Sequence, residues 1–211
     1  QDSPDYRLFF GALENLYPGT PLADDIAGTR DSISDITIDN LHENFDLFYH
    51  PSQMHLLVIG KFDVDPILQV LKEYDQISQL PSIKMERFPV EKNEVKLNQS
   101  CRMDVATPKL AIGIRGNDDI KEEEKFRYKL MLKLLFSMMF GWTSQRFQSL
   151  YEAGKIDNSL TLEVEVEELF HFVILTMDTK EPVSLSHQFR SAIKQFDKDP
   201  DVNQEHLDTI K

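Results

Sequence analysis

The chain lacks several features on which common classes of protein depend. It has one cysteine, Cys101, among 211 residues, which excludes an internal disulfide framework and fits either a reducing compartment or an incidental thiol. Its eight glycines are scattered, so no glycine-rich loop that could cradle a phosphate is present. No apolar run approaches the roughly 20 residues that a membrane-spanning helix needs. These absences argue against a disulfide scaffold, a phosphate-loop enzyme and a membrane span.

Basic residues are also few. The sequence has 23 Lys and Arg against 36 Asp and Glu, a formal net charge of −13. Nucleic acids and anionic membranes require a basic patch, so neither is expected as the main partner. The composition is 41% hydrophobic and 28% charged, which is enough apolar material for a buried core. A chain of this length forms one large or two small domains.

The zinc-hydrolase motifs are absent. These enzymes place two histidines on one helical turn, as H-E-x-x-H or its inverse H-x-x-E-H, so that both rings reach one ion. The nearest match is Glu205-His206, but Val202 occupies the position of the first histidine. His42-Glu43 fails likewise, because Asp46 stands where the second histidine belongs. His50 and His55 lie across a predicted turn with no third ligand, and His171 is expected in the middle of a strand as a hydrogen-bonded core or face residue.

Other catalytic groups have simpler explanations. Glu163, Glu165 and Glu167 project from one face of a predicted strand, roughly 6.6–6.8 Å apart, a spacing that an inverting glycosidase pair could use. A solvated strand face explains them more simply. The potential nucleophiles are Ser144, which suits a helix cap, Ser149 and Cys101. We therefore assign no catalytic, cofactor-binding or metal-binding residue to this chain.

The first third of the chain predicts a helix-helix-strand-helix segment. Ser3 and Thr37 are predicted to cap the first two helices. A stripe of Ile38, Leu41, Phe45 and Phe48 is expected to be buried. His50-Pro51 ends that helix, and a buried strand is predicted from Met54 to Gly60, followed by a helix over residues 66–79.

The remaining chain predicts an α+β layer. Strands are expected over residues 94–105 and 110–114, and a central helix over 125–140, which is apolar nearly all round from its sixth residue onward. A shorter helix capped by Thr143 or Ser144 follows, then an alternating strand over 160–167 and an interior strand over 169–177. Two helices end the pattern. The prediction is a mostly antiparallel β-sheet with helices packed on one face, in the order β-β-α-α-β-β-α-α.

One specific set of motifs covers residues 2–8, 16–29, 32–41 and 48–63, and includes Tyr17-Pro18 and Phe48-Tyr49-His50-Pro51. These stretches resemble the insulinase, pitrilysin and mitochondrial processing-peptidase family of inverzincin zinc peptidases. A weaker match over residues 140–157 resembles the helix pair of the family's second lobe. The greatest similarity is to bacterial insulinase-like zinc proteases of Firmicutes.

The resemblance implies a division of labour within a longer protein. Residues 1–80 would be the tail of the catalytic lobe without its zinc motif, 81–90 a linker, and 91–211 a second, non-catalytic lobe cut short at its C-terminus. The chain would act as scaffold, chamber wall and peptide contact, while the parent polypeptide holds any zinc. One departure is Thr20, which stands where the family's loop often has histidine.

The expected partners follow from the same resemblance. They are the rest of the parent polypeptide, a peptide or unfolded substrate, and another family member in a homodimer or heterodimer, all in the bacterial cytoplasm. The alternative function is a non-peptidase subunit that pairs with an active zinc peptidase. With the strand from Met54 to Gly60 separated from its own sheet, we expect it to pair onto the edge of the second sheet or with another copy.

Overall fold

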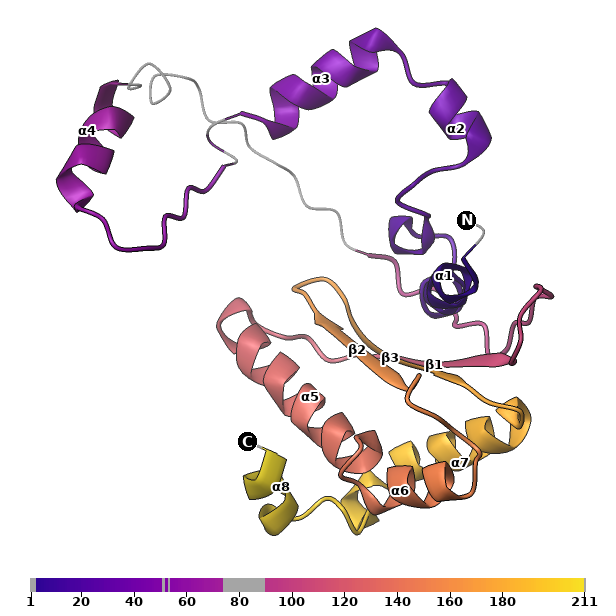
Figure 1. The fold of residues 1–211 in the computed structure, drawn as a ribbon. Helices are drawn as coiled ribbons and strands as arrows, with labels where there is room; N and C mark the ends of the chain where they lie inside the picture. The colour runs from indigo at the N-terminus through magenta and orange to yellow at the C-terminus, as the bar shows by residue number, and fades with distance from the viewer. Residues whose placement is uncertain (1–2, 51, 53, 74–89, 211) are drawn as a thin grey trace. The chain divides into compact units, whose positions relative to one another are not determined.

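The computed structural model describes residues 3–50, 52, 54–73 and 90–210 (Figure 1). The chain divides into two compact units, one formed by residues 1–25 with 89–211 and the other by residues 26–88. The predicted linker over residues 81–90 lies almost wholly outside the described residues, and the division into two lobes and a linker stays a prediction.

The first unit is built on a three-stranded antiparallel sheet with the order β1-β3-β2. The strands are β1 (Lys109–Arg115), β2 (Thr161–Val166) and β3 (His171–Asp178). The register places Ile174 of β3 opposite Gly113 of β1 and Glu163 of β2. β3 is therefore the central strand, and its apolar character on both faces confirms the interior strand expected from the sequence.

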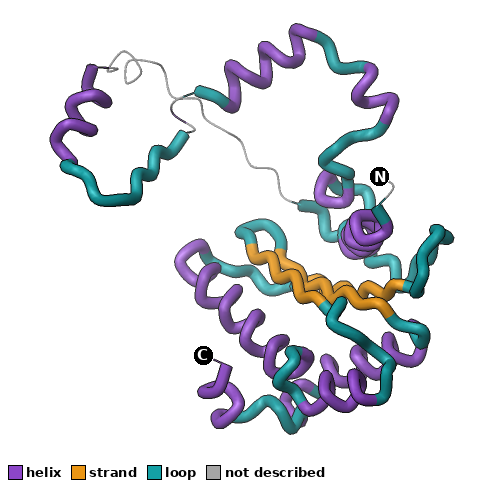
Figure 2. Tube along the Cα trace, in the orientation of Figure 1, coloured by secondary structure: helices purple, strands orange, loops and turns teal. Residues whose placement is uncertain are grey.

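Helices cover one face of this sheet (Figure 1). They are α5 (Lys125–Phe140), α6 (Gln145–Glu152) and α7 (Pro182–Lys194), with the short α8 (Gln204–Ile210) beside α5. Figure 2 shows this arrangement of helices and strands along the Cα trace. A core that includes Val173, Leu175 and Phe189 fills the space between sheet and helices. The α+β class, the antiparallel sheet and the limits of α5 are confirmed.

The opposite face of the sheet is covered by α1 (Pro4–Leu16), which the sequence had placed in the preceding lobe. Leu13 and Leu16 of α1 form a second core with Phe172 and Ile174 of β3. The side chain of Ser3 accepts a hydrogen bond from the first turn, as predicted for a cap. β3 is thus buried on both faces, because its alternate side chains point to two different helical layers.

The second unit contains α2 (Arg30–Ser34), α3 (Ile38–Phe48) and α4 (Val64–Glu73). Capping boxes at Thr29 and Thr37 begin the first two helices. The stripe of α3 was predicted to be buried, and this prediction is wrong, because all four of its apolar side chains are exposed. The periodicity identified an apolar face correctly, but no described residue of the unit buries it.

Two predicted strands are not present as strands. Residues 54–59 are exposed and form no strand, which contradicts the buried strand expected from Met54 to Gly60, and no described strand pairs with them. Their pairing with another copy of the chain stays a prediction. Residues 94–105 are likewise not a strand; this segment runs past the end of α1, where Lys96 N donates to the Asn15 carbonyl at 2.9 Å. A strand requires a neighbour for its backbone groups, and alternation alone does not supply one.

Within the described residues, no helix has both the length and the apolar character needed to cross a membrane.

The central position of β3 leads to a first prediction. Ile174→Ala should lower the free energy of unfolding of the first unit by about 2–5 kcal/mol, because Ile174 is fully buried and leaves a cavity. Urea denaturation followed by the fluorescence of Trp142, which lies in this unit, measures the change. Val183→Ala, an exposed site on α7, is the control and should change stability by less than about 0.5 kcal/mol. Similar effects of the two substitutions would contradict the central role of β3.

Candidate functional site

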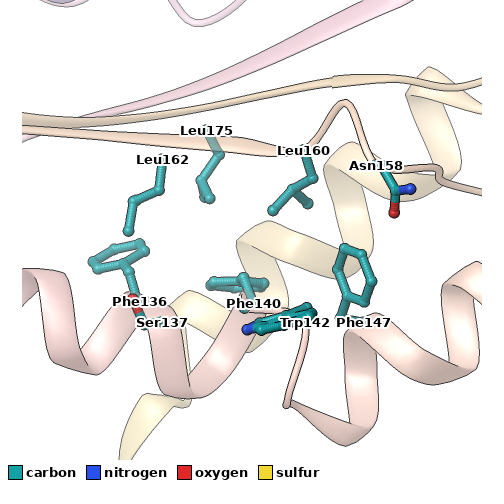
Figure 3. Close-up of a pocket in the computed structure, with 10 residues that line it drawn as sticks. Phe136, Ser137, Phe140, Trp142, Phe147, Asn158, Leu160, Leu162 and Leu175 are labelled. Atoms are coloured by element: carbon teal, nitrogen blue, oxygen red, sulfur yellow. The ribbon is translucent and has the colours of Figure 1, made fainter. Parts of the chain in front are cut away.

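An apolar pocket of about 260 Å³ lies in the first unit between the sheet and the junction of α5 with α6 (Figure 3). Leu160, Leu162 and Leu175 point into it from the sheet side. Aromatic rings form the helix side, and these are Phe136, Phe140, Trp142 and Phe147. The lining is thus almost wholly apolar, with the side chain of Asn158 at one end.

The pocket owes its shape to the turn that ends α5. The N–H of Gly141 donates to the Ser137 carbonyl at 2.8 Å. A Cβ at position 141 would lie 2.4 Å from that carbonyl oxygen, so only glycine permits this close approach. The next residue, Trp142, is 76% exposed and lies beside Phe140 along the helix side of the pocket (Figure 3). The turn therefore holds a large aromatic ring at the surface, next to an apolar hollow.

Two caps fix the start of α6 behind this turn. The buried Ser144 hydroxyl accepts from the N–H of Phe147 at 3.0 Å, which confirms the predicted capping role of Ser144. The carboxylate of Asp201, from the segment before α8, accepts from the N–H of Gln145 at 2.9 Å. A negative charge at a helix N-terminus also interacts favourably with the helix dipole.

A partly buried ion pair joins the same segments. The guanidinium of Arg146 lies 2.7 Å from the carboxylate of Asp199, whose side chain is 1% exposed. Arg146 also donates to the Met139 carbonyl at 2.9 Å, and its charge lies 5.3 Å from the centre of the Phe140 ring. Phe140 in turn stacks on Phe189 of α7 at 4.7 Å. One side chain thus ties the last turn of α5, the start of α6 and the segment before α8 together.

Helix α8 also contacts the turn, through His206. Its Nδ1 lies 2.9 Å from the Asp201 carbonyl, and its Nε2 lies 2.9 Å from the Thr143 hydroxyl. A carbonyl oxygen can only accept, so Nδ1 carries a proton and Nε2 accepts from the hydroxyl of Thr143. His206, which sequence inspection tested as a metal ligand, is therefore engaged in holding the turn.

The pocket lies along β2, an edge strand of the sheet. β3 pairs with one side of β2, and no strand in the described part of the chain pairs with the other. The turn before β2 is ordered by Ser159, whose hydrogen bonds hold the pKa of Asp157 below its usual range. An unpaired strand edge next to an apolar pocket offers backbone groups and a side-chain site together.

Two of the three glutamates that the sequence placed on one strand face lie in ion pairs. Glu165 pairs with Lys129 at 2.8 Å, and Glu167 with Lys125 at 3.0 Å. These contacts agree with the strand-face interpretation of the sequence. Cys101 is exposed and does not lie in a strand, although one was expected there.

Among the described residues, no group of three or more His, Cys, Asp or Glu side chains could hold a metal ion. His171 was expected mid-strand with a hydrogen-bonded ring. It is instead the first residue of β3 and is buried, with Nε2 lacking a hydrogen-bond partner among the described residues.

Sequence reasoning missed the pocket. The end of the central helix at residue 140 was predicted correctly, but Trp142 was not used. A tryptophan directly after a helix-ending glycine, between two apolar helices, was the available signal. Apolar side chains were identified, but periodicity cannot show whether they close a core or leave a gap.

Comparison with protein families gives one match over most of the chain. The model described as "Peptidase M16 inactive domain" matches residues 35–211.

Curated relatives are similar in kind. The chain is 35% identical over 196 residues to the uncharacterized zinc protease YmfH of Bacillus subtilis (strain 168). This alignment covers 91% of the chain and 46% of the relative. It is 28% identical over 158 residues to the mitochondrial presequence protease of Schizosaccharomyces pombe. This second alignment covers 71% of the chain and 15% of the relative. The chain therefore spans less than half the length of these relatives.

A solved structure shares the fold. The crystal structure of an M16-like peptidase from Alicyclobacillus acidocaldarius superposes with a TM-score of 0.80 at 24% identity, covering 99% of this chain and 50% of that one.

The Arg146–Asp199 pair generates the second prediction. Arg146→Ala should cost about 3–5 kcal/mol of unfolding free energy, because it leaves the carboxylate of Asp199 buried without its cation. Lys155→Ala is the control, since Lys155 pairs with Glu181 at a more exposed position, and its cost should stay below about 1 kcal/mol. Chemical denaturation measures both. Equal costs would show that Arg146 does not fix the turn.

Proposed function

Because the chain belongs to the family of the peptidase M16 inactive domain, we propose that it is the non-catalytic segment of an insulinase-like zinc peptidase. In this role it acts as scaffold and chamber wall, and it contacts the peptide substrate. The observation that supports substrate contact is the apolar pocket beside the unpaired edge of β2.

An extended peptide fits this combination of features. Its backbone can add to a free strand edge, where main-chain hydrogen bonds supply affinity without regard to sequence. Alternate side chains of a strand point the same way, so one large apolar side chain can enter the pocket while its neighbours stay in solvent. A pocket lined by leucines and aromatic rings favours an apolar side chain and disfavours a charged one.

Catalysis is assigned to the rest of the parent. The described residues bring together no metal-binding group, so zinc does not fit this part of the chain, and no step of peptide hydrolysis is assigned to its side chains. The relatives are about twice as long or longer, which leaves room for a zinc-bearing segment elsewhere in a parent protein.

The second unit supports the scaffold role. The apolar faces of α3 and the stretch 54–59 are exposed, although their patterns are those of buried elements. We propose that the remainder of the parent polypeptide covers them, so that the unit completes a lobe to which this chain contributes only a part. The single cysteine and the bacterial relative fit the bacterial cytoplasm, which we propose as its compartment.

The third prediction uses Trp142, the only tryptophan in the sequence, as a reporter. Titration with a peptide that carries a single leucine or phenylalanine among small polar residues should shift Trp142 emission to shorter wavelength, because the peptide removes water from an exposed indole. A matched peptide with aspartate at the apolar position should leave the emission unchanged. N-methylation of alternate peptide bonds should weaken binding, because it removes donors to the strand edge.

Variants locate that binding on the pocket. Leu162→Asp should weaken the peptide at least about tenfold, since a charge in an apolar pocket costs more than about 1.4 kcal/mol. Glu163→Gln changes the other face of the same strand and is the control, with unchanged affinity expected. If the aspartate peptide binds as well as the leucine peptide, or if Leu162→Asp has no effect, the pocket is not a peptide contact.

The fourth prediction concerns the division of labour. The full-length parent should contain stoichiometric zinc and cleave peptides, whereas the 211-residue chain should do neither, because its described residues form no ligand set. Elemental analysis and a quenched-fluorescence peptide assay measure this. Zinc-dependent cleavage by this chain alone would overturn the proposal. A full-length parent with neither zinc nor activity would instead identify a non-catalytic partner subunit.

A further inference from the structure

His171 occupies an unusual position at the end of the first unit away from the peptide pocket. It is 5% exposed, and its Nε2 has no hydrogen-bond partner among the described residues. The ring lies against the backbone of Gly116, where an added Cβ would come within 1.7 Å of Nε2. The ring of Tyr128 from α5 meets it edge-on at 5.5 Å. A polar nitrogen is therefore enclosed without a partner, which is rare in folded proteins.

The backbone of the same residue joins three elements. The carbonyl of His171 accepts from the N–H of Gly116, just after β1, at 2.9 Å. It also accepts from the hydroxyl of Tyr17, just after α1, at 2.9 Å. β3, the end of β1 and the end of α1 therefore meet at His171. A change in its side chain acts directly on that junction.

Charged groups surround a cleft of about 170 Å³ next to the ring. Asp118 accepts a hydrogen bond from the hydroxyl of Tyr128 at 2.9 Å. Lys92 lies 3.7 Å from Asp119, and Arg115 donates to the carbonyls of Leu16 and Asn93. The titratable and charged residues that face the ring or line the cleft are Tyr17, Lys92, Arg115, Asp118, Asp119, Tyr128 and Glu168.

Protonation of the ring is opposed by this environment. Burial lowers the pKa of His171, and Asp118 offsets part of that effect while Lys92 adds to it. Burial raises the pKa of both Tyr17 and Tyr128 to about 12, so neither phenol supplies a negative charge. A protonated ring would have two N–H donors to satisfy. Asp118 is the carboxylate whose charge favours the protonated ring, and it already accepts from Tyr128.

We propose that His171 is a proton-sensitive contact that holds the segment over residues 116–119 against β3 and α5, and releases it when the imidazole takes up a proton. In the released state the ring moves from its enclosed position toward Asp118, and the hydrogen bonds at Gly116 and Tyr17 break together. Acid pH thereby loosens the junction of α1 with the sheet. This release does not depend on peptide binding at the pocket, and its test uses no peptide.

The pH range follows from the lowered pKa. In the opened state the ring titrates near its ordinary value of about 6.5. In the closed state it titrates lower, so between the two values only the opened state binds the proton. Opening therefore becomes more favourable as pH falls below about 6.5, by up to about tenfold per pH unit, and levels off once the closed state also protonates. Above that range the contact contributes its full stability.

Amide exchange at Gly116, measured by NMR between about pH 7.5 and about pH 5 and corrected for intrinsic rates, tests this inference. In the unmodified chain, protection of Gly116 should fall as pH decreases below about 6.5. His171→Gln removes the titrating group and should make that protection independent of pH. His187→Gln changes an exposed histidine on α7 and should keep the full dependence.

A second variant decides the matter if His171→Gln does not fold. Asp118→Asn keeps an acceptor for Tyr128 but removes the charge that favours the protonated ring, so the loss of protection should continue to lower pH before it levels off. The ¹⁵N shifts of the His171 ring should show it neutral at about pH 6.5 in the unmodified chain. Protection that does not change with pH, or a ring that titrates at its ordinary value, would overturn the proposal.

Discussion

The first unit depends on the burial of β3 on both faces and along both edges. Its side chains alternate between two cores, with Phe172 and Ile174 toward α1 and Val173 and Leu175 toward the helices on the other face. A strand enclosed in this way cannot slip by one residue, because a slip would exchange the two sets of side chains. β1 and β2 are aligned by β3, so the positions of the apolar pocket and of His171 are both consequences of its register.

The junction of α5 with α6 shows that a gap in the core can be held open. Arg146 and the buried Asp199 form an ion pair, which is weak evidence for net stability because desolvating the charges is costly. The same pair, with the caps from Ser144 and Asp201, fixes the direction in which the chain leaves α5. A hydrophobic contact could stabilise this turn equally well but would define it less sharply. The number of polar contacts that fix this turn agrees with a pocket whose shape is important for its function.

Elements whose limits are marked by local sequence signals were predicted well. Features that depend on a packing partner far away in the sequence were not. The limits of α5 were predictable because local signals mark both ends, Glu122–Glu124 before it and Gly141 after it. β3 was recognised because a short run that is apolar on both faces has few alternatives. The stripe of α3 was also read correctly as apolar, but its burial was not, because the partner of an amphipathic face is not encoded in its period. The strand predicted from Met54 to Gly60 is wrong for a related reason, because an apolar run does not show which strand would pair with it.

The proposed role explains why an inactive domain carries a well-formed pocket. A peptidase lowers its reaction barrier with binding energy, and part of that energy comes from portions of the substrate far from the bond that is cut. A site that binds one apolar side chain and pairs the peptide backbone with a strand edge restricts the position of the whole peptide. It needs no catalytic group of its own to do so. The geometry at Gly141 and Trp142 would then influence turnover as well as affinity. In such an arrangement, loss of the zinc motif from a domain removes the chemistry and leaves the positioning.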